Sequence, residues 1–187
     1  MKKLLTVSAI LLLVLVYAGN ISAKPKKETT QPIIGAFGIK LGQIFNPANN
    51  PENRVLDSGA ILYHFTPKKR FRSFHKYYVL ITPETHRVYC IWAIGKIKNG
   101  DAGRSEQAVI IALLEKKYGV QAETPPFSLF DTKWIDQGNR TITVRVKSFW
   151  VKSIEIRYFD LDLQRQAEKE RISIELDKIG KVEDSGL

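Results

Sequence analysis

The sequence predicts an α+β fold in which helices pack on antiparallel β-meanders, in the order βββ-α-βββ-α. Short segments rich in Val, Ile, Tyr and Phe, bounded by turn residues, predict the strands. One capped helical segment separates two groups of three such strands, and a long charged segment with spaced Leu, Ala and Ile follows the second group. Runs of strands interrupted by helices are typical of a layered α+β domain.

The first group of strands follows a loop rich in Asn and Pro (46–53) and is predicted over 60–65, 74–81 and 87–97. In the third of these, one face carries Val88, Cys90, Trp92 and Ile94, and the other carries Tyr89, Ile91 and Ala93. A strand with two apolar faces is covered on both sides, so we expect it to be central in the sheet.

The central helix is predicted over 104–118, because one of its sides is followed in steps of three and four by Ala108, Ile111, Ala112 and Glu115. A turn at 99–101 offers the N-cap. Gly119 stands where a C-cap is expected, after two lysines that suit the negative end of the helix dipole.

The second group of strands is predicted around 134–135 and over 141–146 and 153–159. The last segment, 161–179, is predicted to be a surface helix, although its stretch 172–176 also fits a strand. We therefore expect a single α+β domain over 36–180, followed by a C-terminal tail over 181–187.

The N-terminus has the pattern of a secretory signal peptide over 1–23. Lys2 and Lys3 precede an apolar core, and cleavage is expected after Ala23, ahead of a flexible leader over 24–35. The alternative is an uncleaved anchor, but the apolar stretch falls short of the roughly 20 residues that span a bilayer. We expect export to the periplasm or the exterior and no transmembrane span in the mature chain.

The charge of the chain favours anionic partners. The chain carries 29 basic and 19 acidic residues, and removing Lys2 and Lys3 leaves 27 against 19, or +8. Such a charge draws a protein toward anionic lipid, polymer or acidic protein, unless it serves solubility alone. Cys90 is the only cysteine, which excludes an intramolecular disulfide and a zinc site built from cysteine pairs.

Three short segments stand out as a set: FGIKLG at 37–42, ITPET at 81–85 and LLEKKYG at 113–119. Together with the strand segments after them, they resemble small exported bacterial proteins with a helix-plus-meander body, in outline over about 36–160. The resemblance implies export and this architecture. It carries no catalytic residue.

No catalytic motif is assembled in the sequence, so we expect no catalytic residue, no metal and no cofactor. His64, His75 and His86 recur every 11 residues, but His86 lies beyond the far end of a strand and too far away to share an ion with the others. Cys90 lies in an apolar stretch, where a thiol is unreactive. An envelope hydrolase remains an alternative, with carboxylates drawn from Glu84, Glu106, Asp131 and Asp136.

The strongest local signal is the segment 66–78, in which five Lys or Arg side chains alternate with four aromatic ones. Basic groups contact phosphates, and exposed aromatic rings stack on bases or sugars or enter a lipid interface. Alternatively, the rings of Phe71, Phe74 and Tyr78 turn into the core and the charges are simply solvated. A second patch over 140–152 carries a Trp in a connecting turn. The predicted ligand-binding residues are Lys68, Lys69, Arg70, Phe71, Arg72, Lys76 and Trp150.

We therefore expect an exported, non-catalytic binding module that recognises an envelope protein or an anionic envelope component through its basic aromatic loop. The alternatives are the carboxylate-dependent hydrolase and a peripheral binder of anionic membrane or polymer, whose contacts would weaken with salt. No signature of a specific nucleic-acid-binding fold is present.

Overall fold

The computed structural model describes residues 31–49 and 53–184. The predicted signal peptide, the leader up to residue 30 and residues 185–187 lie outside the described residues. The longer strands are β5 (Lys76–Ile81), β6 (Val88–Lys96), β7 (Asp131–Gln137), β8 (Arg140–Lys147) and β9 (Ser153–Asp160), and the shorter elements are β1 (Gly35–Ala36), β2 (Ile39–Lys40), η1 (Pro47–Asn49), β3 (Asn53–Val55) and β4 (Ile61–His64). The helices are α2 (Gly100–Tyr118) and α3 (Leu161–Asp184).

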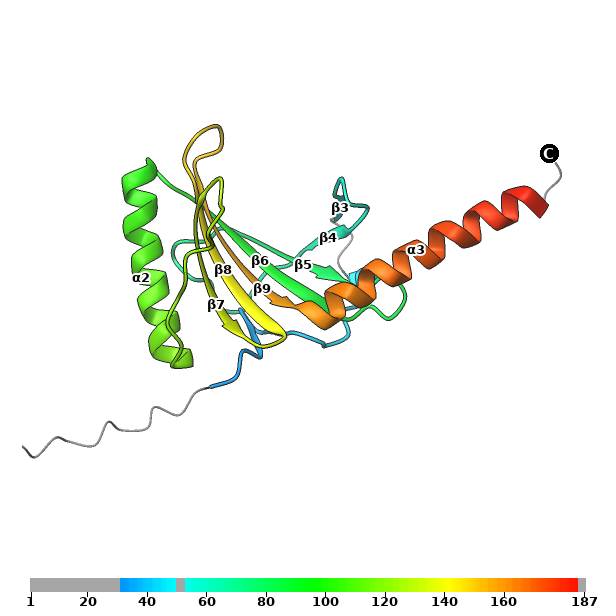
Figure 1. Ribbon diagram of the computed structural model, residues 1–187, viewed down its shortest axis with the longest axis horizontal. Coiled ribbons are helices and arrows are strands. Elements are labelled where there is room, and N and C mark those ends of the chain that lie inside the picture. The colour runs from blue at the N-terminus through cyan, green and yellow to red at the C-terminus, as the bar shows by residue number, and fades with distance from the viewer. Residues whose placement is uncertain (1–30, 50–52, 185–187) are drawn as a thin grey trace, which may run out of the picture.

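Seven strands form one antiparallel sheet in the order β3-β4-β5-β6-β9-β8-β7 (Figure 1). The α+β class predicted from the sequence is confirmed. Two meanders, β3 to β6 and β7 to β9, join where β6 pairs with β9 from Cys90 opposite Phe159 to Lys96 opposite Ser153. The strand with two apolar faces, β6, is the central one of the seven.

The alternation expected along β6 is wrong at its first two positions. A register shift between Leu80 and Ile81 places Ile81 opposite Val88. As a result Val88 packs in the main core, whereas Tyr89 joins Cys90 in a smaller cluster on the other face. A bulge inserts one residue, so the alternation of faces starts anew beyond it.

One face of the sheet is covered by α2, which contacts β7, β8 and β9. The side chain of Asn99 caps its first turn by accepting from the amide of Ala102 at 2.9 Å, and Gly119 ends it at φ 65°. The buried positions of α2 are Gly103, Gln107, Ile110, Leu114 and Tyr118, a different side from the one that carries the periodic pattern. Gln107 faces inward because its amide donates to the backbone oxygens of Asp131 and Val144, at 2.9 and 2.8 Å.

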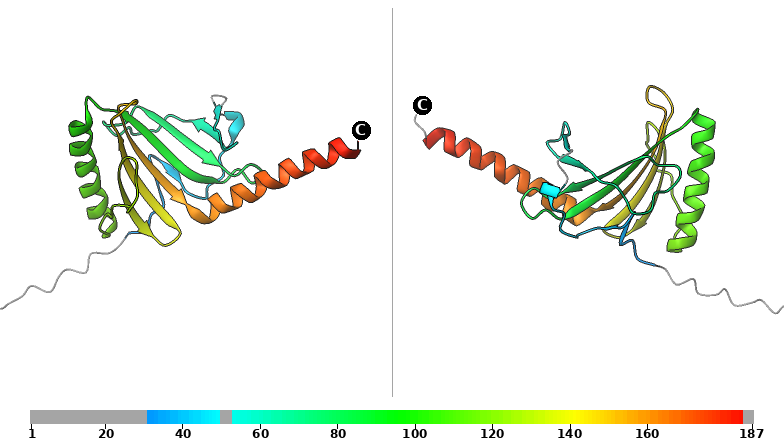
Figure 2. Two further views of the ribbon diagram at one scale, coloured as in Figure 1. Left: turned by 45° about the horizontal axis from the view of Figure 1, so that its top comes forward. Right: turned by 180° about the vertical axis from the view of Figure 1, so that it is seen from behind.

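The opposite, or second, face of the sheet is covered only in part. The first turns of α3 place Leu163 and Ala167 against a cluster that includes Leu80, Cys90 and Phe159. With 24 residues α3 is about 36 Å long, and its second half extends away from the sheet (Figures 1 and 2). The stretch 172–176 is helical.

Ordered structure extends beyond both ends of the domain predicted over 36–180. Ile33 is only 1% exposed, and its amide donates to the side chain of Gln137 at 2.8 Å. The end of the predicted leader is therefore packed against the sheet. At the other end α3 continues to Asp184, beyond the expected boundary at 180.

The antiparallel order brings alternate connections to the same end of the sheet. The connections β4–β5 (65–75), β6–α2 (97–99) and β8–β9 (148–152) meet there, together with the segment leading into β7 (124–130). We call these four segments the loop end. The turns 82–87 and 138–139 and the start of α3 lie at the opposite end.

Candidate functional site

The structure brings all seven predicted site residues to the loop end or to the strand that leaves it. Trp150 is 99% exposed at the turn between β8 and β9. The five predicted cations are also exposed: Lys68, Lys69, Arg70, Arg72 and Lys76. Phe71 is half-buried, with its ring centroid 5.7 Å from that of the buried Phe74. The rings of this loop therefore anchor it while the cations face solvent.

The loop over 65–75 is held in place by β5 and α2. The hydroxyl of Tyr77 donates to the backbone oxygens of Phe71 and Phe74 at 3.2 and 3.1 Å, and the amide of Phe71 donates back to it. Ser73 donates to the carboxylate of Glu106 on α2. Because these contacts lie between the basic side chains, the cations are presented from a braced backbone.

The loop end is strongly cationic. Eight exposed or half-exposed Lys and Arg side chains there form no ion pair with a carboxylate among the described residues: Lys68, Lys69, Arg70, Arg72, Lys76, Lys96, Lys98 and Lys152. Among the described carboxylates near the loop end, Asp101, Asp131 and Glu155 are each ion-paired. The turns and strand ends at the opposite end carry further ones: Glu84, Asp136, Asp160 and Asp162. The molecule thus has a charge asymmetry along its strands.

Five large apolar side chains are also exposed at the loop end. Phe149, Trp150 and Val151 occupy the turn after β8, and Phe127 and Leu129 lie in the segment before β7. Phe127 is 96% and Phe149 is 77% exposed. The two segments are neighbours because Asp131, at the start of β7, pairs with Val146 near the end of β8. We call these five residues the apolar tip.

Behind the apolar tip, the second face of the sheet carries a buried carboxylate among three cations. Glu155 is 4% exposed and pairs with Lys147 at 2.6 Å and Arg157 at 3.1 Å. Arg157 also lies over the ring of Trp92, 3.9 Å from its centroid. Burial, together with the charge of Arg157, lowers the pKa of the neighbouring Arg145. Because both ion pairs share the carboxylate of Glu155, the three cations exceed the negative charge of the cluster by two.

A groove of about 870 Å³ joins the basic loop to the apolar tip across the second face. Its walls include His75 and Lys76 on one side and Val151 and Lys152 on the other. Two buried donors on this wall, the indole N–H of Trp92 and the hydroxyl of Ser153, have no hydrogen-bond partner among the described residues. What the groove presents to a ligand is therefore the cations at its rim, because these two donors are buried.

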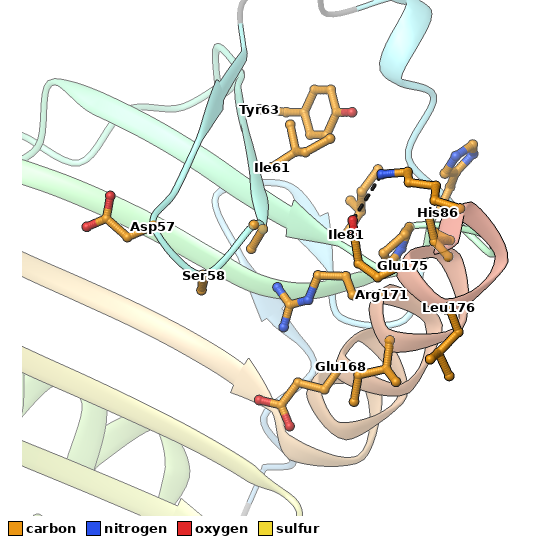
Figure 3. A pocket seen from close by; sticks show the side chains of 16 residues that line it. Asp57, Ser58, Ile61, Tyr63, Ile81, His86, Glu168, Arg171, Glu175 and Leu176 are labelled. Atoms are coloured by element: carbon orange, nitrogen blue, oxygen red, sulfur yellow. Dashed lines mark hydrogen bonds and ion pairs between the residues drawn. The ribbon is translucent and has the colours of Figure 1, made fainter. Parts of the chain in front are cut away.

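A second cavity, also about 870 Å³, lies at the opposite end between α3 and the β3–β4 hairpin. Figure 3 shows Ile61 and Tyr63 of β4 on one side and Glu168 and Arg171 of α3 on the other. Glu175 is paired with Lys178 at 2.9 Å, the contact dashed in Figure 3. Its chemistry is mixed, with single charges of both signs around apolar walls.

Cys90 and the three histidines are the other candidate reactive groups of the chain. Cys90 is fully buried, and burial raises the pKa of its thiol to about 12. His64 and His75 both line the groove, whereas His86 lies in the turn at the other end of β5. No three His, Cys, Asp or Glu side chains within residues 31–49 and 53–184 are placed to hold a metal ion.

Of the carboxylates considered for hydrolysis, Glu106 accepts a hydrogen bond from Ser73, and Asp131 is both ion-paired and far from Asp136. Asp131 and Asp136 stand five residues apart on β7, about 17 Å, beyond the spacing of a glycosidase pair. Asp131 pairs with Arg104 at 3.1 Å. Glu170, at the opposite end of the sheet, accepts from the amides of Glu84 and Thr85 and from Gln166, and these hydrogen bonds lower its pKa. A catalytic acid requires the reverse shift.

No family model, curated protein or solved structure matches this chain. The resemblance to small exported bacterial proteins stays a prediction. No helix in the described part of the chain is long and apolar enough to cross a membrane.

Sequence reasoning found the basic loop and Trp150 but missed the other members of this site. Lys96 and Lys98 are scattered singly along the chain, and Phe127 and Leu129 follow a Pro-Pro pair with no periodic pattern. The local signals were the charge run at 68–72 and the Trp-bearing turn of the patch over 140–152. The alternation of connections in a meander could have linked the turns after β4 and β6, because every second turn of a meander lies at the same end.

Proposed function

We propose that this chain is an exported, non-catalytic binding module that attaches to an anionic partner through its loop end. The observation that carries the proposal is the group of eight unpaired cations at one end of a sheet that carries further carboxylates at the other. A charge asymmetry of this kind orients a protein toward an anionic surface and accelerates its association.

The cluster around Glu155 supports the same function. A buried carboxylate that balances neighbouring cations keeps them folded against the sheet without neutralising all of them. The groove beside it adds Lys76, Lys96 and Lys152 at the rim. An anionic group such as a phosphate or carboxylate fits these cations better than a neutral ligand does.

Replacing Lys68, Lys69, Arg70 and Arg72 with Ser is expected to weaken binding to anionic vesicles and to polyphosphate on the order of a thousandfold at low salt. Each basic side chain near an anionic surface contributes about 1 kcal/mol. The matched control replaces four exposed cations away from the loop end, also with Ser: Lys40, Arg87, Lys116 and Lys169. Titrations at about 0.05 M and about 0.5 M salt measure the affinities of both variants and of wild type. The wild-type affinity should be lower at the higher salt concentration. Equal losses in the two variants would show that net charge alone is responsible.

Export is tested separately. We expect the full chain, produced in a bacterial host, to be recovered outside the cytoplasm with the mass of a protein that begins at Lys24. An Ala23→Arg variant should be processed poorly, because the cleavage site requires a small residue. Recovery of the unprocessed wild-type chain in the membrane fraction would favour the anchor alternative.

A further inference from the structure

We propose that the anionic partner is a lipid bilayer and that the apolar tip inserts into its interface. This inference rests on the proposed function and names its partner. The juxtaposition that carries it is that of five exposed apolar side chains and eight unpaired cations at one end of the sheet. Figure 1 shows the turn between β8 and β9 standing out beyond the sheet at this end.

The apolar tip has no role in the packing of the domain. Trp150, Phe149 and Phe127 are at least three-quarters exposed, whereas the two hydrophobic clusters are closed by other residues. Exposed apolar groups that lie together on a protein surface mark a site that binds another protein or a membrane. Two adjacent turns provide such a group here.

A lipid bilayer can bind the cations and the apolar tip of the loop end at the same time. Headgroup phosphates meet the cations, while Trp and Phe side chains rest at the boundary of headgroup and acyl chain. A soluble polyanion offers no apolar layer for the tip. The cations also come from three separate connections and their adjoining strands, and a continuous negative surface matches that spread.

The rest of the molecule is compatible with this orientation. Carboxylates such as Asp136 and Asp160 lie at the opposite end, where they would face away from anionic lipid. The helix α3 starts from that same end, and its second half extends to the side, away from the sheet (Figure 1). Electrostatic attraction and repulsion therefore favour the same orientation.

The experiment compares the tip variant Phe149→Ser/Trp150→Ser with a control at two exposed apolar positions of α3, Ile172→Ser/Leu176→Ser. The probes are vesicles of phosphatidylglycerol and phosphatidylcholine, vesicles of phosphatidylcholine alone, and polyphosphate. Each buried aromatic side chain contributes about tenfold, so the tip variant should lose about a hundredfold in binding to the anionic vesicles. Its binding to polyphosphate should stay within about twofold of wild type. The control variant should bind anionic vesicles and polyphosphate with wild-type affinity.

Tryptophan emission gives a direct readout of insertion. Anionic vesicles should shift the wild-type emission to shorter wavelength, and brominated acyl chains should quench it; the Trp150→Ser variant should show neither effect. Wild-type affinity of the tip variant for anionic vesicles would overturn insertion and leave the proposed function standing. Equal binding to phosphatidylcholine alone would overturn the anionic requirement. Failure of the wild type to bind vesicles and polyphosphate would overturn the proposed function, and the inference with it.

Discussion

Glu155→Gln is expected to lower the free energy of unfolding by about 3–5 kcal/mol, the usual cost of breaking a buried ion pair. The change removes the carboxylate that pairs with Lys147 and Arg157 and leaves these two cations beside Arg145 without a counter-charge. Glutamine keeps the shape and one acceptor, so the loss reports charge more than packing. Urea unfolding monitored by circular dichroism measures it.

The control is Glu175→Gln, which breaks an exposed pair with Lys178 and should change stability by less than about 1 kcal/mol. Inorganic phosphate provides a second test. Because an anion can take the place of the lost carboxylate, added phosphate should raise the melting temperature of the Glu155 variant more than that of wild type. Similar small losses in the two variants would show that the carboxylate of Glu155 is not needed to balance the cluster.

Gly95→Ala is expected to lower the free energy of unfolding by about 3 kcal/mol and to weaken binding at the loop end. A Cβ atom on Gly95, in the central strand β6, would overlap the backbone oxygen of Ser73 and touch Ile154 at 3.0 Å. Backbone cannot rotate away as a side chain does, so the loop over 65–75 must move, and its cations with it. Urea unfolding and binding to anionic vesicles measure the two effects.

The control for this change is Gly180→Ala on the exposed part of α3. A Cβ atom there meets nothing within 4 Å. Alanine should stabilise the helix by about 0.5–1 kcal/mol and leave vesicle binding unchanged. Wild-type stability of Gly95→Ala would mean that the loop tolerates displacement from β6.

The predicted site residues illustrate how far local sequence leads. Lys68 to Arg72 were found because cations adjacent in sequence remain adjacent in space. The partners that complete the site, Lys96, Lys98 and Lys152, lie at the end of β6 and in other connections. Lys96 and Lys98 join the basic loop because β6 pairs with β5. Lys152 joins it because β6 also pairs with β9, a contact between segments about 60 residues apart.

The burial of particular polar side chains could not be predicted from the local sequence pattern either. Glu155 alternates with Ile154 and Ile156, so the pattern places it on the second face of the sheet, and the structure agrees. On that face, however, Glu155 is buried between Lys147 and Arg157. Gln107 faces the sheet because two backbone oxygens accept its amide hydrogens. These oxygens belong to residues of β7 and β8, so the burial of Gln107 does not follow from the periodicity of α2.

The sequence by itself determined the α+β class, the central place of β6, the capped helix α2 and the basic charge, because alternation, capping and composition act over short stretches of chain. The tertiary structure alone decided which turns share an end, which side of α2 packs and which cations lack a carboxylate. These properties depend on strand pairing between distant segments and on the desolvation that the pairing imposes. The loop end is therefore a product of topology, although its most basic segment can be seen in the sequence.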